Sequence, residues 1–329
     1  MKTIKLTCFL CLVLLPSTIQ GPFSFKDFVQ MTDRGEELEY LGSGKDSIIY
    51  KVELAKSKKI VAMKITQILR SKRTPSVLNT WEYTIYSYMN AINNATVEDY
   101  GIPAVYSYHA GFGGYELLAI TLLDPQFTKL VETSNNRLED LDILIIMREF
   151  VRITKYIHSK GVCHNDLHLR NLMFRGNQGF IIDFDRSLEV NGRVDHESDC
   201  RKVDWQKIFS ELCRLCGLTV DSENHEKTLE NVKNMNNNNG LRSVLLLFAD
   251  YAFKVKNAPP IDYNKMHEEI TKVIRGHGVK EPALVSWLTE EQKNDVKTEW
   301  LKKQTPAIEN IAEPKTHYNY PKPKLNYFE

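Results

Sequence analysis

The sequence has no surplus of charge of either sign. Its 329 residues include 43 lysines and arginines against 42 aspartates and glutamates, so the formal net charge is only +1. Without a basic excess, no global electrostatic argument favours nucleic acid or an anionic membrane surface as a partner. The sequence also lacks internal repeats, and beyond its N-terminal segment it lacks any apolar run long enough to span a bilayer. We therefore expect neither nucleic-acid binding nor a membrane span in the mature chain.

Cysteine is scarce, with six residues in the whole chain. Two of them, Cys8 and Cys11, fall in an N-terminal segment that we expect to be removed. The remaining cysteines are Cys163, Cys200, Cys213 and Cys216. Their even number fits an oxidising compartment, and three disulfide pairings are possible. Cys213 and Cys216 have the spacing of half a zinc site, but no second such pair completes it, and we interpret them as buried free thiols.

What the chain does contain at its N-terminus is the pattern of a secretory signal. Lys2 and Lys5 begin an apolar segment over residues 6–15, which has signal-peptide length and is too short to cross a bilayer. We predict that residues 1–21 are a signal peptide and that the product is secreted or enters the lumen of the secretory pathway. An uncleaved N-terminal anchor is the alternative.

The most informative stretch lies between residues 161 and 186. A His-x-Asp motif ends at Asp166, Asn171 follows five residues later, and Asp183 closes the apolar run 180–182. Phosphoryl transfer needs a carboxylate near the attacking hydroxyl and oxygen ligands for a metal ion that neutralises phosphate charge. The stretch resembles the catalytic loop and the metal-binding turn of the protein-kinase-like fold. This resemblance implies that Asp166 is the catalytic aspartate and that Asn171 and Asp183 bind Mg²⁺, or Mn²⁺ in its place.

Upstream signals occur in the order expected of a kinase. Gly42, Ser43 and Gly44 form a glycine-rich turn between two strand-like runs, and its glycines allow the backbone to approach phosphates. Lys64 ends an apolar strand-like run, where an unpaired ammonium would be costly, and Glu82 on the following predicted helix can neutralise it. By resemblance, the turn covers the phosphates of ATP, Lys64 contacts its α- and β-phosphates, and Glu82 holds Lys64 in place.

The hydrophobic periodicity predicts a small antiparallel sheet followed by a mainly helical region. Expected strands cover 40–52 as a hairpin, 59–65, 102–109, 115–121, 172–174 and 180–182, and expected helices cover 78–89, 138–159, a segment opening at 203, 241–255, 264–275 and 289–303. In the kinase resemblance this is an α+β bilobal fold, and backbone groups of Thr121 and Leu123 meet the adenine edge of ATP. The run from Ile120 to Pro125 looks similar to that of the casein-kinase-one group.

These elements divide the chain into four parts. Residues 1–21 are the expected signal peptide, 34–121 the N-lobe and 122–303 the C-lobe. Residues 304–329 are polar and contain several prolines, so we expect an extended or disordered tail.

Several departures from the kinase pattern concern the substrate. Asn165 replaces the arginine that usually precedes the catalytic aspartate, which argues against switching by activation-loop phosphorylation. His168 stands where serine/threonine kinases usually carry a lysine that contacts the transferred phosphate. Asp185 replaces the glycine of Asp-Phe-Gly, so a flipping switch is not expected at this turn. The segment 184–202 is short and lacks Ala-Pro-Glu, so the usual platform for a substrate peptide is hard to build.

The sequence therefore predicts an ATP-dependent phosphotransferase, and we expect a secreted kinase that acts on serine or threonine hydroxyls of proteins. A small-molecule kinase is one alternative, because residues 163–167 read Cys-His-Asn-Asp-Leu and resemble choline kinases and aminoglycoside phosphotransferases. A secreted pseudokinase that acts as a binding scaffold is the other, motivated by His168, by Asp185 and by Ser47, which stands where the third glycine of the glycine-rich loop usually sits. The complete set of phosphoryl-transfer residues favours catalysis.

Overall fold

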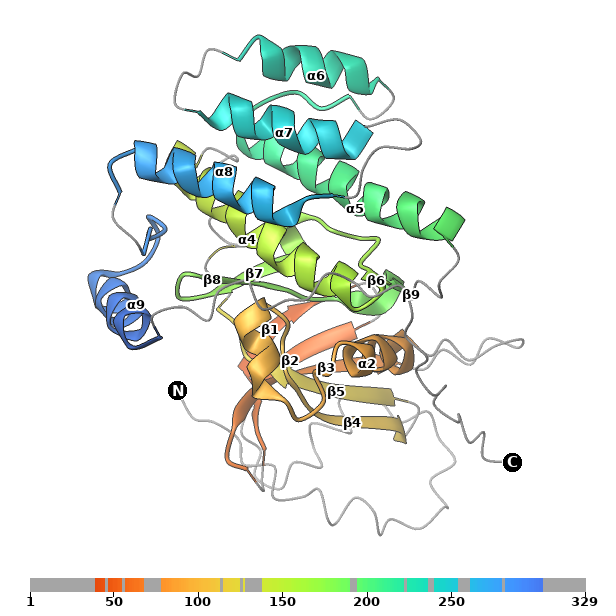
Figure 1. Ribbon diagram of the computed structural model, residues 1–329. Helices are drawn as coiled ribbons and strands as arrows, with labels where there is room; N and C mark the ends of the chain where they lie inside the picture. Colours follow the sequence, from red (N-terminus) through yellow and green to blue (C-terminus); the bar gives the residue numbers. More distant parts are fainter. Residues whose placement is uncertain are drawn as a thin grey trace, which may run out of the picture.

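The computed structural model describes residues 39–44, 47–54, 57–67, 78–112, 115–124, 127, 138–189, 194–221, 224–235, 240–253, 261–279 and 282–303. The expected signal peptide and C-terminal tail lie outside these ranges and stay predictions. Within them, no helix combines the length and the apolar character that crossing a membrane requires. The chain forms a small lobe built on a sheet and a larger lobe built from helices (Figure 1), which confirms the predicted bilobal α+β fold.

The small lobe contains a five-stranded sheet in the order β1-β2-β3-β5-β4, in which neighbouring strands are antiparallel. Its strands are β1 (Glu39–Ser43), β2 (Ser47–Glu53), β3 (Ile60–Gln67), β4 (Val105–Phe112) and β5 (Tyr115–Thr121). Helix α2 (Leu78–Tyr88) lies against β4 and β5, and the short helix η3 (Ala95–Tyr100) precedes β4.

Strand β3 shows how the pleat of the sheet positions a functional side chain. Successive side chains of a strand point to opposite faces, and Val61, Met63 and Ile65 all enter a small apolar cluster on one face. Ala62 enters the main core, to which α2 also contributes. Lys64 lies two residues after Ala62 and therefore points to the same face, toward α2.

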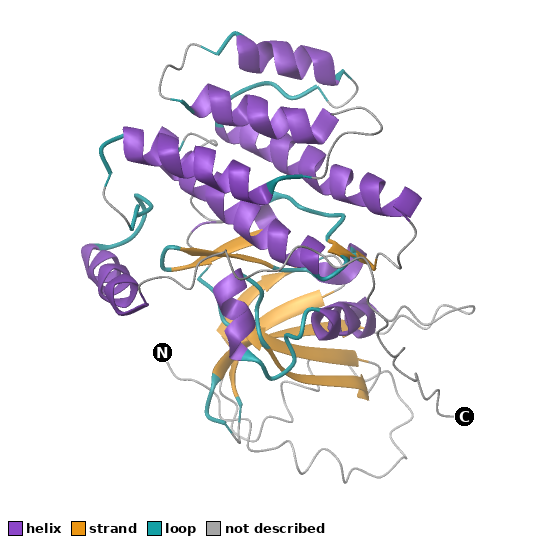
Figure 2. Cartoon of the chain, viewed as in Figure 1, coloured by secondary structure: helices purple, strands orange, loops and turns teal. Residues whose placement is uncertain are grey.

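The large lobe is organised around α4 (Asp140–Ser159), which is buried along almost its whole length. Helix α4 packs against α8 and α5 packs against α7 (Figure 1). The other helices of this lobe are α5 (Val194–Leu215), α6 (His225–Lys233), α7 (Leu241–Phe253), α8 (Tyr263–Gly276) and α9 (Glu290–Lys303). Short strand pairs, β6 (Val162–Cys163) with β9 (Leu188–Glu189) and β7 (Leu172–Arg175) with β8 (Gln178–Ile181), lie between α4 and the main sheet (Figure 2).

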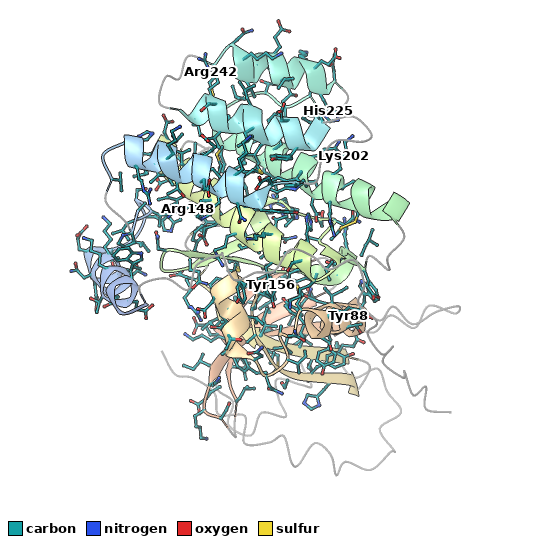
Figure 3. The ribbon with its side chains drawn as sticks, in the orientation of Figure 1. Tyr88, Arg148, Tyr156, Lys202, His225 and Arg242 are labelled. Carbon is teal, nitrogen blue, oxygen red and sulfur yellow. A yellow bond between two sulfur atoms is a disulfide. The ribbon has the colours of Figure 1, made fainter. Side chains whose placement is uncertain are left out.

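Tyr156 contacts residues of both lobes. It belongs to α4 and stacks on Tyr100 with ring centroids 4.4 Å apart. Its hydroxyl donates a 2.7 Å hydrogen bond to the carbonyl of Met89, just after α2. Figure 3 shows Tyr156 where the helical lobe meets the small lobe. These contacts connect α4, which leads into the predicted catalytic loop, to the end of α2 and to η3.

Some element boundaries differ from the sequence prediction. Helix α5 begins at Val194 and not at Val203. The prediction missed its first turns because they are polar and show no apolar periodicity. Strand β4 begins after residue 104, since Pro103 has no amide to donate to a ladder. Helix α6 was not predicted, although Asn224 caps it by accepting from the amide of Lys227, a signal that the sequence contains.

Candidate active site

Lys64 lies between two carboxylates from distant parts of the chain. Its Nζ is 2.8 Å from Oε2 of Glu82 and 2.5 Å from Oδ1 of Asp183, so the expected Lys64–Glu82 pair is present. Burial disfavours the charged ammonium, but the carboxylates of Glu82 and Asp183 outweigh this effect and raise the pKa of Lys64 above its ordinary value. Lys64 therefore stays protonated and can contact an anion.

Glu82 is almost completely buried, with 1% of its side chain exposed. Burial raises the pKa of Glu82, and the nearby Lys64 opposes that rise. Its Oε1 also accepts a 3.3 Å hydrogen bond from the amide of Phe184. Because a buried carboxylate needs such partners, the position of α2 is coupled both to β3 and to the turn that follows β8.

The turn after β8 directs Asp183 toward Lys64. Asp183 has a left-handed backbone conformation, with φ 67° and ψ 67°, which aspartate tolerates better than most residues. The next residue, Phe184, is buried, and its ring centroid lies 5.1 Å from that of Tyr86 and 4.7 Å from that of His164. These ring contacts join α2, the turn and the catalytic loop into one packed unit.

Asp204 on α5 holds the backbone of the predicted catalytic loop. Its carboxylate accepts hydrogen bonds of 2.9 Å from the amide of His164 and 2.7 Å from the amide of Asn165, and its Oδ2 lies 2.9 Å from Nε2 of His158. Asn165 has φ 60°, a left-handed conformation that asparagine adopts readily. The loop is therefore shaped by a completely buried carboxylate.

Asp166, the predicted catalytic aspartate, lies among three basic side chains. Its Oδ1 is 3.0 Å from Nζ of Lys207, and its Oδ2 is 3.6 Å from Nη1 of Arg186 and 3.8 Å from Nε2 of His168. Burial raises the pKa of Asp166, but Lys207 and then the other cations outweigh burial, so the pKa lies below its ordinary value. Sequence reasoning missed Lys207, which is 41 residues away and whose proximity comes from the packing of α5.

The residues predicted to bind metal provide suitable oxygen atoms. Asn171 is buried, and its Nδ2 donates a 3.0 Å hydrogen bond to the carbonyl of Asp166. This bond does not involve the carboxamide oxygen, which can therefore bind a metal ion. Asp183 contacts Lys64 through one carboxylate oxygen, and its side chain is 38% exposed. Burial, and after it the charge of Asp183, raises the pKa of the neighbouring Asp185. This donor set of carboxylate and carboxamide oxygens fits Mg²⁺, which Asn171 and Asp183 would hold.

The glycine-rich turn lies at the start of the main sheet. Gly42 and Ser43 end β1, and the amide of Gly44 donates a 2.9 Å hydrogen bond to the carbonyl of Ser47 at the start of β2. The tip of the turn, residues 45–46, lies outside the described residues. The turn and Lys64 thus belong to adjacent regions of one sheet, because Ile49 of β2 pairs with Lys64.

The predicted adenine contacts follow the other end of the sheet. Thr121 ends β5, and its amide donates a 3.0 Å hydrogen bond to the carbonyl of Ala104, so this amide is not available to a base. Its hydroxyl donates to Oε1 of Glu98 at 2.6 Å. The carbonyl of Thr121 and the backbone of the buried Leu123 remain the candidates for adenine recognition.

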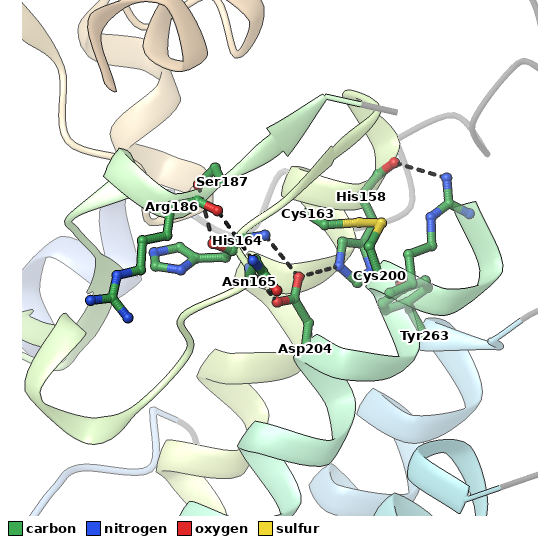
Figure 4. The surroundings of a disulfide bond; sticks show 10 residues. His158, Cys163, His164, Asn165, Arg186, Ser187, Cys200, Asp204 and Tyr263 are labelled. Carbon is green, nitrogen blue, oxygen red and sulfur yellow. Dashed lines mark hydrogen bonds and ion pairs between the residues drawn. A yellow bond between two sulfur atoms is a disulfide. The ribbon is translucent and has the colours of Figure 1, made fainter. Parts of the chain in front are cut away.

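A disulfide between Cys163 and Cys200 joins β6 to α5 (Figure 4). Cys213 and Cys216 are free thiols, as predicted, and burial raises the pKa of each to about 12. The structure therefore joins Cys163 to Cys200 and leaves the other two cysteines as thiols, and the closed loop contains the predicted catalytic loop and metal-binding turn. Asp204 lies beside this disulfide in Figure 4.

Comparison with known proteins agrees with this geometry. Residues 36–206, more than half of the chain, match the protein kinase domain. Serine/threonine-protein kinase D of Synechocystis sp. is 28% identical over 173 residues, which are 50% of this chain and 32% of the relative. A probable casein kinase I homologue of Encephalitozoon cuniculi is 25% identical over 160 residues, or 47% of each protein. The chain thus spans about a third to about a half of the length of these curated relatives.

Proposed function

We propose that this chain, which belongs to the protein kinase family, transfers the γ-phosphate of ATP to serine or threonine hydroxyls of a protein. The observation that carries the proposal is the position of Lys64, whose ammonium contacts both Glu82 and Asp183 across separations of 18 and 119 residues. The contact brings the predicted phosphate-binding lysine to the predicted metal ligand.

The other residues supply complementary roles. Asp166 orients the acceptor hydroxyl and accepts its proton as the oxygen attacks phosphorus. Lys64 contacts the α- and β-phosphates, and Glu82 holds the ammonium in place. When bound by Asn171 and Asp183, a divalent metal supplies positive charge that the phosphates need. The turn Gly42-Ser43-Gly44 lies over the phosphates, and adenine meets the backbone of Thr121 and Leu123.

The relatives favour a protein as the acceptor, since one is named a serine/threonine-protein kinase and another a probable casein kinase I homologue. One observation favours a small-molecule acceptor. Helix α5 begins at Val194, shortly after β9, so little chain lies between the metal-binding turn and α5 for binding a peptide. A small-molecule kinase is therefore the second candidate.

A labelling assay separates these candidates. Purified chain 22–329 is incubated with γ-labelled ATP and Mg²⁺ or Mn²⁺, against serine, threonine and tyrosine peptides and a panel of hydroxylated metabolites. We expect label on serine or threonine peptides. Label on metabolites alone would support the second candidate. A chain that binds Mg-ATP and labels no acceptor would be the scaffold-type pseudokinase, and the proposal would be wrong.

We also propose that the protein functions in the secretory pathway or outside the cell. Residues 1–21 have the pattern of a signal peptide, and the Cys163–Cys200 disulfide is of the kind that persists in oxidising compartments. Both features support the same compartment independently.

Reduction of this disulfide is expected to destabilise the protein. Cross-linking positions 37 residues apart restricts the unfolded chain, so reductant should lower the free energy of unfolding by about 4 kcal/mol and the melting temperature by about 6 °C. Thermal unfolding with and without reductant measures this. Cys200→Ala should abolish the sensitivity to reductant, and Cys216→Ala should retain it. Mass spectrometry that finds Cys163 and Cys200 unpaired in secreted protein would contradict the assignment.

A further inference from the structure

Lys207 occupies an unassigned position at the centre of the site. It lies on α5, three residues after Asp204, so both side chains leave the helix on the same side. Asp204 binds the amides of the catalytic loop, and Lys207 Nζ donates 2.5 Å to the carbonyl of Asn165 and 3.0 Å to Oδ1 of Asp166. One helical turn thus fixes the loop backbone and places an ammonium against the predicted catalytic carboxylate.

The contacts leave capacity for an additional ligand. An ammonium has three N–H donors, and the carbonyl of Asn165 and the carboxylate of Asp166 account for two. The Lys207 side chain is 38% exposed, so a solute can reach it. Because Lys207 Nζ is already bonded to Asp166, the predicted partner of the acceptor hydroxyl, an acceptor bound at Asp166 would lie close to the remaining donor.

The other basic side chains near Asp166 are less well placed. Nε2 of His168 is 3.8 Å from Asp166, beyond hydrogen-bond distance, although His168 occupies the position of the usual lysine. Nη1 of Arg186 is 3.6 Å away, and its side chain is 66% exposed. Among the Asp166 ion pairs within the described residues, Lys207 alone therefore makes a hydrogen bond.

We propose that Lys207 is a catalytic residue that donates a hydrogen bond to the transferred phosphoryl group, in place of the lysine that His168 replaces. This inference rests on the proposed phosphotransfer. In the step, the bond between the γ-phosphorus and its bridging oxygen breaks, and a bond from the acceptor oxygen to phosphorus forms. ADP leaves with the bridging electrons, and the acceptor proton goes to Asp166. Lys207 remains protonated throughout and neutralises charge on the phosphoryl oxygens.

The test compares Lys207→Met, Lys207→Arg and Lys202→Met in chain 22–329. Lys202 is on the same helix, but at 3.6 residues per turn it faces another direction, and Figure 3 labels it. We expect Lys207→Met to lower kcat by about 100-fold, with little change in the KM for ATP and in the melting temperature. Lys207→Arg should recover at least about tenfold of that loss, because it retains a cationic donor. Lys202→Met should match the wild type.

The readout is independent of the acceptor, because hydrolysis of Mg-ATP by water is measured beside transfer to whichever acceptor the wild type labels. Label on metabolites alone would overturn the proposed protein acceptor. In that case a lowered kcat of Lys207→Met toward the metabolite would still support the role of Lys207. A Lys207→Met enzyme with kcat within about twofold of the wild type would overturn the role of Lys207 alone. Equal losses in Lys207→Met and Lys207→Arg with lowered melting temperatures would also overturn it, since that result indicates a structural residue. A wild type without turnover would overturn both proposals.

Discussion

Replacing Asp166 with asparagine is expected to abolish phosphoryl transfer while Mg-ATP still binds. Asparagine has the size of aspartate but cannot accept the proton of the acceptor hydroxyl, so kcat should fall by about 10³-fold. The nucleotide contacts assigned to Lys64 and Asp183 remain, because neither residue touches Asp166 in the hydrogen bonds described above. Transfer of labelled phosphate measures kcat, and calorimetric titration with Mg-ATP measures binding.

Asp295→Asn provides the matched control. Asp295 is exposed on α9, so the same chemical change there should leave both transfer and binding unaltered. Transfer by Asp166→Asn at the rate of the wild type would show that another group orients the acceptor. Loss of Mg-ATP binding together with transfer would place Asp166 in the nucleotide site instead.

Replacing Lys64 with methionine is expected to reduce both activity and stability. The variant loses the cation assigned to the phosphates, so transfer should fall at least about 100-fold. It also leaves Glu82, of which 1% is exposed, without its ion-pair partner. Removing one partner of a buried pair is strongly destabilising, and we expect a loss of about 3 kcal/mol in the free energy of unfolding, measured by denaturant titration.

The pH dependence of stability tests whether Glu82 causes the loss of stability in Lys64→Met. In Lys64→Met, burial raises the pKa of Glu82 with no ammonium to oppose it, so the folded state holds a proton more tightly than the unfolded state. A group whose pKa is higher in the folded state stabilises the protein fully below its unfolded-state pKa. This stabilisation is lost as the pH rises through the folded-state pKa. The variant should therefore be more stable relative to the wild type at about pH 5 than at about pH 8.

The double variant Lys64→Met/Glu82→Gln separates the two effects. Glutamine carries no charge, so the double variant should regain much of the lost stability and stay inactive. A stability of Lys64→Met that equals the wild type at both pH values would contradict the account of Glu82 as a carboxylate that depends on Lys64.

The sequence could predict that Lys64, Glu82 and Asp183 belong to one site, and the structure brings them into contact, because phosphoryl transfer restricts both residue type and spacing. Asp166 and Asn171 lie five residues apart within one loop, and Asp183 follows a short strand pair, so local sequence carries the pattern. The Lys64–Glu82 pair was also predictable, since an ammonium at the end of a buried strand needs a carboxylate nearby. Element boundaries were less accurate where polar residues form helix, as at Val194.

Other features depended on contacts between elements that the sequence does not connect. The sequence allowed three cysteine pairings, and the packing of α5 against β6 selected Cys163 with Cys200. Backbone groups of Thr121 were expected to meet adenine, but its amide donates to the carbonyl of Ala104 and is therefore not available. The contact of Lys207 with Asp166 was not predictable, because it depends on the turn of α5 that also carries Asp204.

By itself, the sequence determined the two-lobed fold and predicted a set of residues for phosphoryl transfer, because hydrophobic periodicity and the spacing of residues within one loop are local properties. Only the tertiary structure decided which cation contacts Asp166 and which cysteines are joined. Those outcomes depend on helix α5 packing against the predicted catalytic loop. The free energy that places α5 there comes from burying side chains such as Trp205 among residues distant in sequence.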